Sequence, residues 1–396
     1  MLPFEVQHFS TGTADTAPSF HADTVHHVEF DFYGQRVATV SSDKTVCIWD
    51  KDTQNGAWRK SASWKKHGGA VWKVRFAHPE YGQVLATCSF DNTIQIFDKD
   101  AADLSEIRPI TGADSSNGWA CRTVLRQSNA SASITDIQFA PHYLGLQLAA
   151  CTSSGRLIIY EAEDIMALDN WNVLHDYEVT KNRLSSLSWS TNRFDPPHIV
   201  VSSDDVDAAP SEKVFLFRVN SSCGLVRLNP TAGGGGDGKQ FNFADQVSAV
   251  CFGPSCGLAQ HKLAVAVGAK VAVFQLVSGP NAAALFADDS NGDESVAPIM
   301  PMLTMEDGRA QTGDETSSAA AAAAELTING CEVLEEGNAA QVVRLSWNVI
   351  GDVISAVYSD GIIRVWRYIF SNRWILATTI TPPAEQNRSA KDDVYY

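Results

Sequence analysis

Short runs of apolar residues that alternate with polar ones recur along almost the whole chain. Residues 40–50 (VSSDKTVCIWD) contain a small polar pair, an acidic turn and alternate apolar residues that end on an aromatic ring, and residues 87–98 (TCSFDNTIQIFD) repeat this order. Alternation with a period of two predicts a half-buried strand. A short acidic side chain before it stabilises a tight turn by bonding to its own backbone. Because a second apolar run precedes each turn, each stretch is predicted to be a β-hairpin.

Four more hairpins of this kind follow, at residues 146–161, 198–218, 262–275 and 352–367. A further short strand ending in an aromatic or apolar pair precedes each of the six hairpins: VHHVEFD, VWKVRFAHP, ITDIQFAPH, LSSLSWS, VSAVCFGP and VVRLSWN. Weaker candidates for a fourth strand occur at residues 58–64, 171–174, 325–329 and 374–380. Six units of this design resemble the WD-repeat family, whose repeats of about 40–45 residues each form a four-stranded propeller blade.

This resemblance predicts an all-β, six-bladed propeller. The Trp-Asp ending of the repeat is intact only at Trp49-Asp50, and Phe97-Asp98 is a near copy. We place the propeller at residues 24–380, with an N-terminal extension at 1–23 and a polar tail at 381–396. Two stretches rich in Gly, Ala or acidic residues, about 229–240 and 278–324, are predicted to be flexible insertions.

Composition narrows the classes of function. The chain has 396 residues, 44% of them hydrophobic, and a net charge of −16. So acidic a chain lacks the clustered Lys and Arg with which a general nucleic-acid surface contacts phosphates. No apolar window is long enough for a membrane-spanning helix, and the N-terminus lacks the basic and apolar regions of a secretory signal. The eight cysteines are scattered, and Cys251 and Cys256 have no partner at a spacing typical of zinc sites, so we expect no metal and no cofactor.

Candidate catalytic residues are few. Asp43, Asp91 and Asp360 recur at the same hairpin position in three units, which indicates a structural turn rather than one catalytic site. His26 and His27 should point to opposite faces of a strand, and neither has a ligand partner. In the WD-repeat family, a histidine placed like His67 joins the turn Asp and the terminal aromatic in a hydrogen-bond network. Unit two ends on Phe97, so its network would lack an indole N–H. We therefore expect no enzymatic activity.

Closure of the ring is an open question, because the sequence shows no seventh unit. Residues 4–9 (FEVQHF) are the only N-terminal candidate for a strand exchanged between the ends of the chain. A ring that closes would pack blade six on blade one. A ring that stays open would leave apolar surface and strand edges exposed, and a strand or blade from a partner could cover them.

Four sequence stretches carry a closer resemblance: residues 77–83, 89–91, 140–149 and 159–171. With the blade pattern, they make the chain similar to the Sec-thirteen-homologous WD-repeat nucleoporins, the small WD-repeat subunits of the Y-shaped scaffold of the nuclear pore. The similarity is strong over residues 24–203 and moderate over 341–374, whereas insertions interrupt it over 211–340.

The resemblance implies a non-enzymatic scaffold protein at the nuclear pore, in the nuclear envelope, that supports nucleocytoplasmic transport. An α-solenoid nucleoporin would insert its N-terminal blade in trans between blades six and one, and other subunits of the Y-shaped complex would be further partners. It also implies a second role in a nutrient-signalling coat complex of the TOR pathway, at the lysosomal or vacuolar surface. The residues expected to pack and pair with the inserted blade are Val25, Val28, Phe30, Val342, Val343, Leu345 and Trp347.

Three alternatives stay open. A vesicle-coat subunit is a sister family, but unit three matches it less well. A substrate receptor of a ubiquitin ligase often carries Trp-Asp-x-Arg at the end of a blade, which Trp49-Asp50-Lys51-Asp52 lacks. A propeller enzyme would need convergent carboxylates or histidines at one mouth of the channel, and the sequence by itself does not reveal such convergence.

Overall fold

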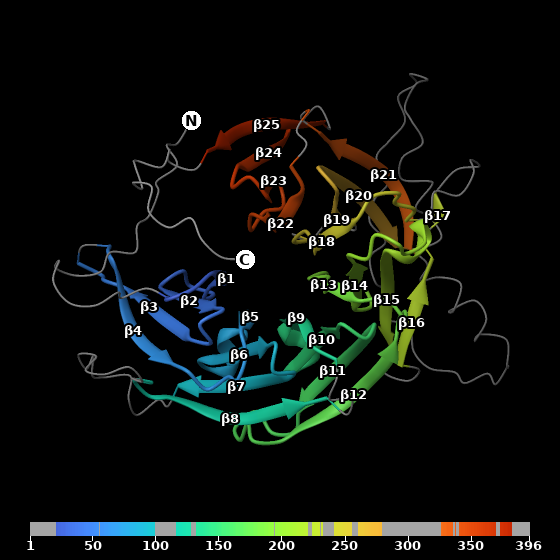
Figure 1. Ribbon diagram of the computed structural model, residues 1–396. Coiled ribbons are helices and arrows are strands. Elements are labelled where there is room, and N and C mark those ends of the chain that lie inside the picture. Colours follow the sequence, from blue (N-terminus) through green and yellow to red (C-terminus); the bar gives the residue numbers. More distant parts are fainter. Residues whose placement is uncertain are drawn as a thin grey trace, which may run out of the picture.

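The computed structural model describes residues 21–381, except 55, 100–115, 128–131, 194, 221–223, 230, 233–240, 256–259, 279–325, 336, 338–339 and 370–372. These residues form strands and three short 3₁₀ helices, and no helix among them is long and apolar enough to cross a membrane. Six sheets lie around a common centre as the blades of a propeller, which confirms the predicted all-β fold (Figure 1).

Each blade contains four consecutive antiparallel strands, and its first strand lies nearest the centre of the ring. The sheet of blade five has a fifth strand, which pairs in parallel. Blades one to three contain β1 (Val25–Phe30), β2 (Arg36–Ser41), β3 (Val46–Lys51) and β4 (Trp58–Trp64); β5 (Val71–Phe76), β6 (Val84–Ser89), β7 (Thr93–Lys99) and β8 (Trp119–Arg126); β9 (Ile134–Phe139), β10 (Gln147–Thr152), β11 (Arg156–Ala162) and β12 (Trp171–Glu178). Blades four to six contain β13 (Leu184–Trp189), β14 (His198–Ser203), β15 (Val214–Asn220) and β16 (Gly224–Leu228); β18 (Val247–Phe252), β19 (Gln260–Val267), β20 (Lys270–Ser278) and β21 (Leu326–Leu334); β22 (Val342–Trp347), β23 (Val353–Tyr358), β24 (Ile363–Ile369) and β25 (Arg373–Ile380). The short helices are η1 (Pro79–Tyr81), η3 (His142–Leu144) and η4 (Pro210–Glu212).

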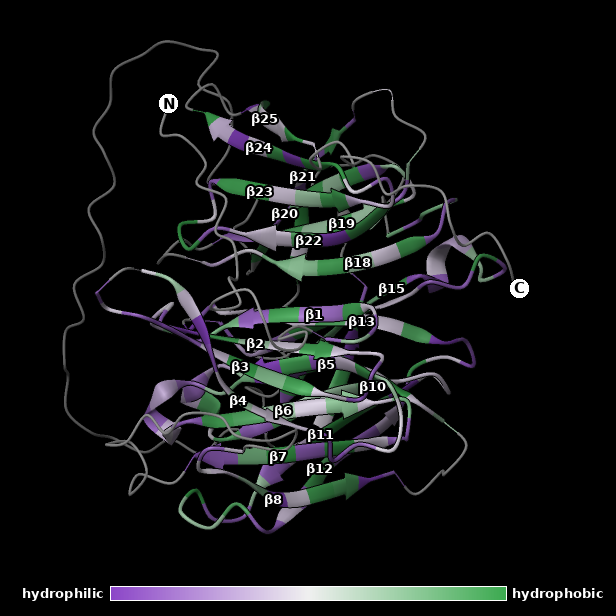
Figure 2. Cartoon of the chain, turned by 60° about the vertical axis from the view of Figure 1, so that its left-hand side comes forward, coloured by the Kyte–Doolittle hydropathy of each residue, from purple (hydrophilic) through white to green (hydrophobic). Residues whose placement is uncertain are grey.

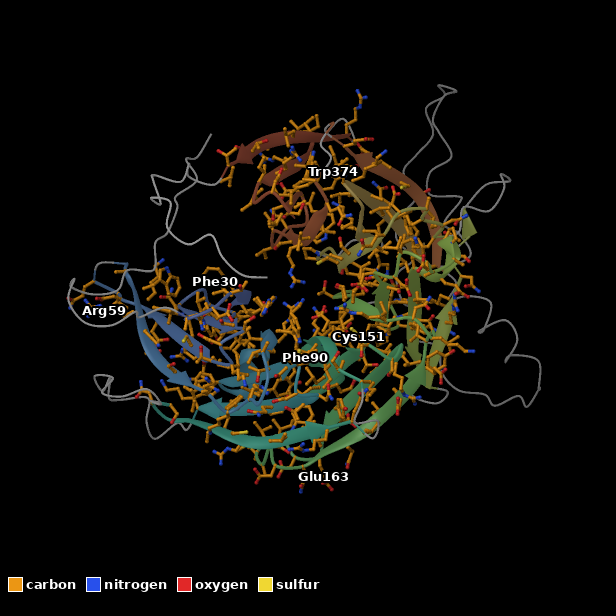
Figure 3. The ribbon with its side chains drawn as sticks, in the orientation of Figure 1. Phe30, Arg59, Phe90, Cys151, Glu163 and Trp374 are labelled. Atoms are coloured by element: carbon orange, nitrogen blue, oxygen red, sulfur yellow. The ribbon has the colours of Figure 1, made fainter. Side chains whose placement is uncertain are left out.

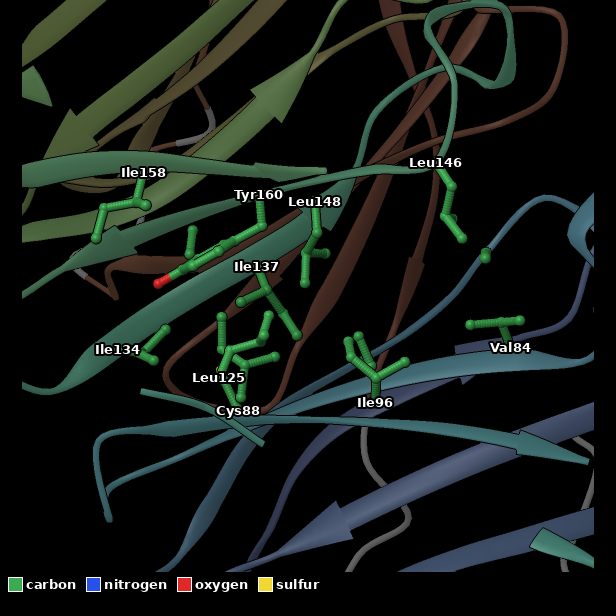
Figure 4. Close-up of a cluster of buried hydrophobic side chains, with 14 of the residues drawn as sticks. Val84, Cys88, Ile96, Leu125, Ile134, Ile137, Leu146, Leu148, Ile158 and Tyr160 are labelled. Carbon is green, nitrogen blue, oxygen red and sulfur yellow. The ribbon is translucent and has the colours of Figure 1, made fainter. Parts of the chain in front are cut away.

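The core of the molecule lies between the blades. Because side chains alternate along each strand, one side of a sheet packs on the preceding blade and the other on the following blade. Apolar clusters of this kind join each blade to the next from blade one to blade six. Figure 4 shows the cluster between blades two and three, which includes Ile96 and Ile137. The alternation is visible in Figure 2, where hydrophilic and apolar residues succeed one another along β1.

The ring of first strands is open. Strand β1 packs on β5, which is followed by β9, β13, β18 and β22. Among the described strands, no contact of comparable extent joins β22 back to β1, and no sheet combines strands from blades one and six. We call the space between these two blades the ring opening. Residues 4–9, the candidate for an exchanged strand, lie outside the described residues.

The structure corrects several details of the sequence analysis. The expected fourth strands at residues 58–64, 171–174 and 374–380 are present, and the one expected at 325–329 is observed from Leu326 onward. The strands β8 and β16 were missed. The expected flexible insertion at about 229–240 contains a short strand, β17 (Thr231–Ala232), which pairs in parallel with β21, and Ser278 is the last residue of β20 rather than part of an insertion. His21 was placed in the N-terminal extension, but its side chain bonds to strand β2 and belongs to blade one.

Candidate functional site

The side of blade one that faces the ring opening is identified by strand register. His27 and Glu29 lie on the side toward blade two, where Glu29 Oε2 is 2.9 Å from Arg75 NH1. Val28 and Phe30 alternate with them and therefore point away from blade two. Their antiparallel partners on β2 are Thr39 and Val37. Figure 3 shows Phe30 on the part of blade one that borders the opening.

Three apolar residues on the first strand of blade one are exposed, whereas the residues at the same positions of the other five blades are covered. Val25, Val28 and Phe30 are 39%, 46% and 55% exposed. The same register gives the equivalent trios on the other five first strands, all of which are buried or half-buried against the preceding blade: Val71, Val74 and Phe76; Ile134, Ile137 and Phe139; Leu184, Leu187 and Trp189; Val247, Val250 and Phe252; Val342, Leu345 and Trp347. The trio of blade one is exposed because no described blade precedes it.

The positions of Val342, Leu345 and Trp347 in blade six therefore correct the prediction that these residues contact the inserted blade. Val342 is only 1% exposed and lies in the core between blades five and six, where Leu345 and Trp347 also pack. The indole N–H of Trp347 donates to the Cys251 carbonyl of blade five at 3.2 Å. Equivalent strand positions point the same way around a ring, so they face the opening in blade one and face blade five in blade six. Val343 is exposed and lines the mouth of the central cavity.

A different set of residues faces the opening from blade six. Ser355, Val357, Ile363 and Ile380 are half-buried. Their equivalents in blade five are Ala264, Ala266, Val271 and Leu334, which are all buried against blade six. The two sides of the opening thus present the surfaces that elsewhere in the ring pack on a neighbouring blade.

The outer part of blade one carries a buried cluster on the same side. It consists of Val37, Cys47, Trp49 and Trp58, all from blade one, whereas the other five clusters each combine residues of two blades. Phe30 lies edge-on to Trp58, with 5.8 Å between the ring centroids. The exposed inner trio lies on the same side of blade one as this buried cluster, and we call Val25, Val28 and Phe30 the blade-one docking face.

A hydrogen-bond network holds Trp49, a member of the buried cluster beneath the docking face. The Trp49 indole donates to Thr39 Oγ1 at 3.0 Å, and His21 Nε2 lies 2.8 Å from the same oxygen. His21 Nδ1 is 2.6 Å from Thr45 Oγ1 and 3.4 Å from Asp43 Oδ2. This links the histidine, the turn carboxylate and the terminal tryptophan of blade one in a single chain of contacts.

Blade two repeats the network without the indole. His67 bridges Thr87 Oγ1 at 2.8 Å and Asp91 Oδ2 at 3.1 Å, while Phe97 stands at the tryptophan position. Burial opposes the charged form of Asp91, but hydrogen bonds from His67 and Thr93 outweigh it and hold the pKa of Asp91 below its usual range.

The third turn carboxylate accepts a hydrogen bond within its own turn. Asp360 Oδ1 accepts the N–H of Ile362 at 3.0 Å within an exposed turn. Asp43 and Asp91 accept in the same way from the N–H groups of Thr45 and Thr93. All three carboxylates sit in separate hairpins, so they do not converge on one site.

A central cavity of about 580 Å³ opens at the end of the ring where the first strands begin. A β-bulge near the start of each first strand turns one side chain into its mouth. These six residues are His26, Trp72, Thr135, Ser185, Ser248 and Val343. The described residues contain no group of three or more His, Cys, Asp or Glu placed to hold a metal ion, and Cys256 lies outside them.

Several structural residues were missed by the sequence analysis. His21 holds in blade one the place that His67 holds in blade two, and only its spacing from Asp43 could have revealed it. The buried ion pair between Lys73 and Asp136 joins blades two and three. His261 contacts Asp195 at 2.8 Å, across the boundary between blades four and five. The two residues of each pair are far apart in the sequence, so no local pattern predicts their contact.

Six blades with a blade-one docking face and an open ring define the class: a WD-repeat propeller with an unfilled interface at its two ends. The family model described as "WD domain, G-beta repeat" matches residues 17–50 and 58–98. Nucleoporin SEH1 of Homo sapiens is 33% identical over 356 residues, covering 89% of this chain and 84% of that protein. Nucleoporin seh1 of Drosophila melanogaster is 35% identical over 362 residues, covering 91% and 86%. The chain belongs to the SEH1 nucleoporin family.

Proposed function

We propose that this chain is a non-enzymatic scaffold subunit of the nuclear pore, within its Y-shaped subcomplex. Its ring opening receives a blade from the N-terminal part of an α-solenoid nucleoporin, which completes the propeller in trans. The names of the relatives support the pore assignment. The single observation that carries the docking mechanism is the exposure of Val25, Val28 and Phe30, whose equivalents in five other blades are covered by the preceding blade.

The physical reason is the cost of uncovered apolar surface. A fully buried Val or Phe side chain contributes about 1.5–3 kcal/mol relative to an exposed one. An inserted blade would bury the blade-one docking face and the half-buried residues of blade six together. The first strand of the inserted blade would lie relative to β1 as β1 lies relative to β5, and the completed ring would have no open side.

A charge in the docking face tests this proposal. Val28→Glu should weaken capture of the α-solenoid nucleoporin by at least about tenfold, because the inserted blade would bury an unpaired carboxylate. The melting temperature of the isolated chain should change little, since Val28 is already 46% exposed. The measurement is affinity capture of the tagged chain from its own cells, with each stoichiometric partner identified and quantified.

The matched control is Val173→Glu, which places the same charge on an exposed valine of the outer strand β12. This variant should capture the partner as the unaltered chain does. Normal capture by Val28→Glu, or recovery of vesicle-coat or ubiquitin-ligase subunits alone, would contradict the proposal. A second role in a nutrient-signalling coat at the lysosomal or vacuolar surface stays a prediction of the resemblance, because no structural observation favours it.

A further inference from the structure

Two positions on each first strand reach toward the next blade. The first follows the β-bulge directly, and the second lies two residues further on, so both side chains point to the same side. We call them the linking positions. They are His27 and Glu29, Lys73 and Arg75, Asp136 and Gln138, Ser186 and Ser188, Ala249 and Cys251, and Arg344 and Ser346 in blades one to six.

Polar linking residues bind the first strand of the following blade. Most of these bonds go to its backbone. Asp136 Oδ2 accepts the Leu187 N–H at 3.2 Å, Gln138 Oε1 accepts the Trp189 N–H at 3.1 Å, Ser188 Oγ accepts the Phe252 N–H at 3.0 Å, and Arg75 Nε donates to the Ile137 carbonyl at 3.2 Å. The linking positions therefore set the position of each first strand relative to the next.

The charged linking residues also pair with one another between blades. Lys73 Nζ is 3.0 Å from Asp136 Oδ1, and both side chains are almost fully buried. Arg75 pairs with Glu29 at 2.9 Å. Burial opposes the charged form of Asp136, but the charges of Lys73, Arg75 and Arg344 outweigh it and lower the pKa of Asp136. In these blades, a cation at a linking position thus meets a carboxylate at a linking position of the neighbouring blade.

Arg344 is a linking cation whose neighbouring blade is missing. It lies on the side of blade six that faces the ring opening, and it lines the cavity mouth together with His26 of blade one. Within the described part of the chain, no hydrogen bond or ion pair of Arg344 is found, although its side chain is half-buried. Its charge, together with the larger effect of burial, lowers the pKa of His26. Ser346, the second linking residue, is exposed at the opening.

We propose that Arg344 forms an ion pair with an Asp or Glu side chain on the first strand of the inserted blade. By the pattern of the ring, this carboxylate occupies the first linking position, which Asp136 holds in blade three. The proposal rests on the proposed function and adds a chemical requirement to it. A half-buried guanidinium would become fully enclosed by the inserted blade, and an enclosed charge is retained only when it is paired. The pair would select a partner by charge in addition to apolar fit.

The test uses the full chain and the α-solenoid nucleoporin that co-purifies with it. Arg344→Gln keeps a hydrogen-bond donor for a backbone carbonyl but removes the charge. We expect it to weaken binding by about 30-fold or more and to reduce the dependence of affinity on salt. The control is Arg183→Gln, which removes an arginine from the same cavity wall on blade four. Its affinity should stay within about threefold of the unaltered chain. Melting temperatures confirm that each variant folds.

A charge exchange identifies the partner residue. Arg344→Glu should bind even more weakly, and replacing one Asp or Glu on the partner's first inserted strand by Lys should restore binding. Unchanged affinity and salt dependence of Arg344→Gln would overturn the ion pair. Failure of every carboxylate replacement to restore Arg344→Glu would overturn the carboxylate assignment. If Val28→Glu abolishes binding while Arg344→Gln does not, the result supports the inserted blade and contradicts only the ion pair. If neither affects binding, the proposed function itself fails.

Discussion

The buried side chain of His198 in blade four gives a quantitative prediction of how the free energy of unfolding depends on pH. The imidazole lies on β14 and is 0% exposed, and neither ring nitrogen has a hydrogen-bond partner among the described residues. Its ring is edge-on to His261, with 5.4 Å between the centroids. Burial, followed by the nearby His261, lowers the pKa of His198 to about 3. Asp195 opposes this effect and Arg218 adds to it.

The sign of the effect follows from proton uptake. The unfolded chain binds a proton at this histidine near its ordinary pKa of about 6.5, whereas the folded chain does not until about pH 3. The contribution of neutral His198 to stability is therefore fully present above pH 6.5 and is lost as the pH falls below it. With these two pKa values, the loss between pH 8 and pH 5 is about 2 kcal/mol.

The assay is urea unfolding of the full chain at several pH values from 8 to 5. His198→Leu removes the titrating group, so its free energy of unfolding should fall by about 2 kcal/mol less over this range than that of the unaltered chain. Val200→Ala, on the same strand β14, removes no titrating group and serves as the control, for which the unaltered slope is expected. An unchanged pH dependence in His198→Leu would refute the assignment of a neutral, buried imidazole.

Two further predictions concern the hairpins of the blades. Gly155→Ala should lower the free energy of unfolding by more than about 2 kcal/mol, since a Cβ there would lie 1.8 Å from the Thr180 carbonyl oxygen and φ is +78°. Gly34→Ala, at φ +64° with nothing within 4 Å, should cost only the backbone strain, about 1–2 kcal/mol; equal losses in urea unfolding would refute the steric argument. Trp49→Phe should cost about 1 kcal/mol beyond the loss of ring size, because it removes the indole bond to Thr39. A double-mutant cycle with Thr39→Val measures this coupling, and a value of zero would contradict it.

The blade pattern was predictable because it is local. Alternating apolar positions, acidic turns and aromatic strand ends sit within each unit, so six hairpins and their first strands could be identified without any long-range contact. The fourth strands β8 and β16 were missed because polar residues interrupt their alternation and the preceding connections differ in length. Likewise, β17 is only two residues long and exists through its pairing with β21.

The candidate site was only half predictable for a geometrical reason. Val28 and Phe30 were selected because blade one begins the ring, and the structure does place them at the opening. Leu345 and Trp347 were selected by the same reasoning, yet they occupy equivalent positions and so point the same way around the ring, onto blade five. The sequence carries the period of two, but the side of a blade that a given residue faces is decided by the bulge and the register.

By itself, the sequence determined the number of units, the strands that most of them contain, the turns that connect these strands and the family resemblance, since each depends on residues near one another in the chain. Only the tertiary structure decided that the described ring is open, which side of each end blade borders the opening, and that Arg344 stands where other blades hold paired charges. These properties arise from contacts between blades, and such contacts join residues that are dozens of positions apart, from Lys73 and Asp136 to His261 and Asp195.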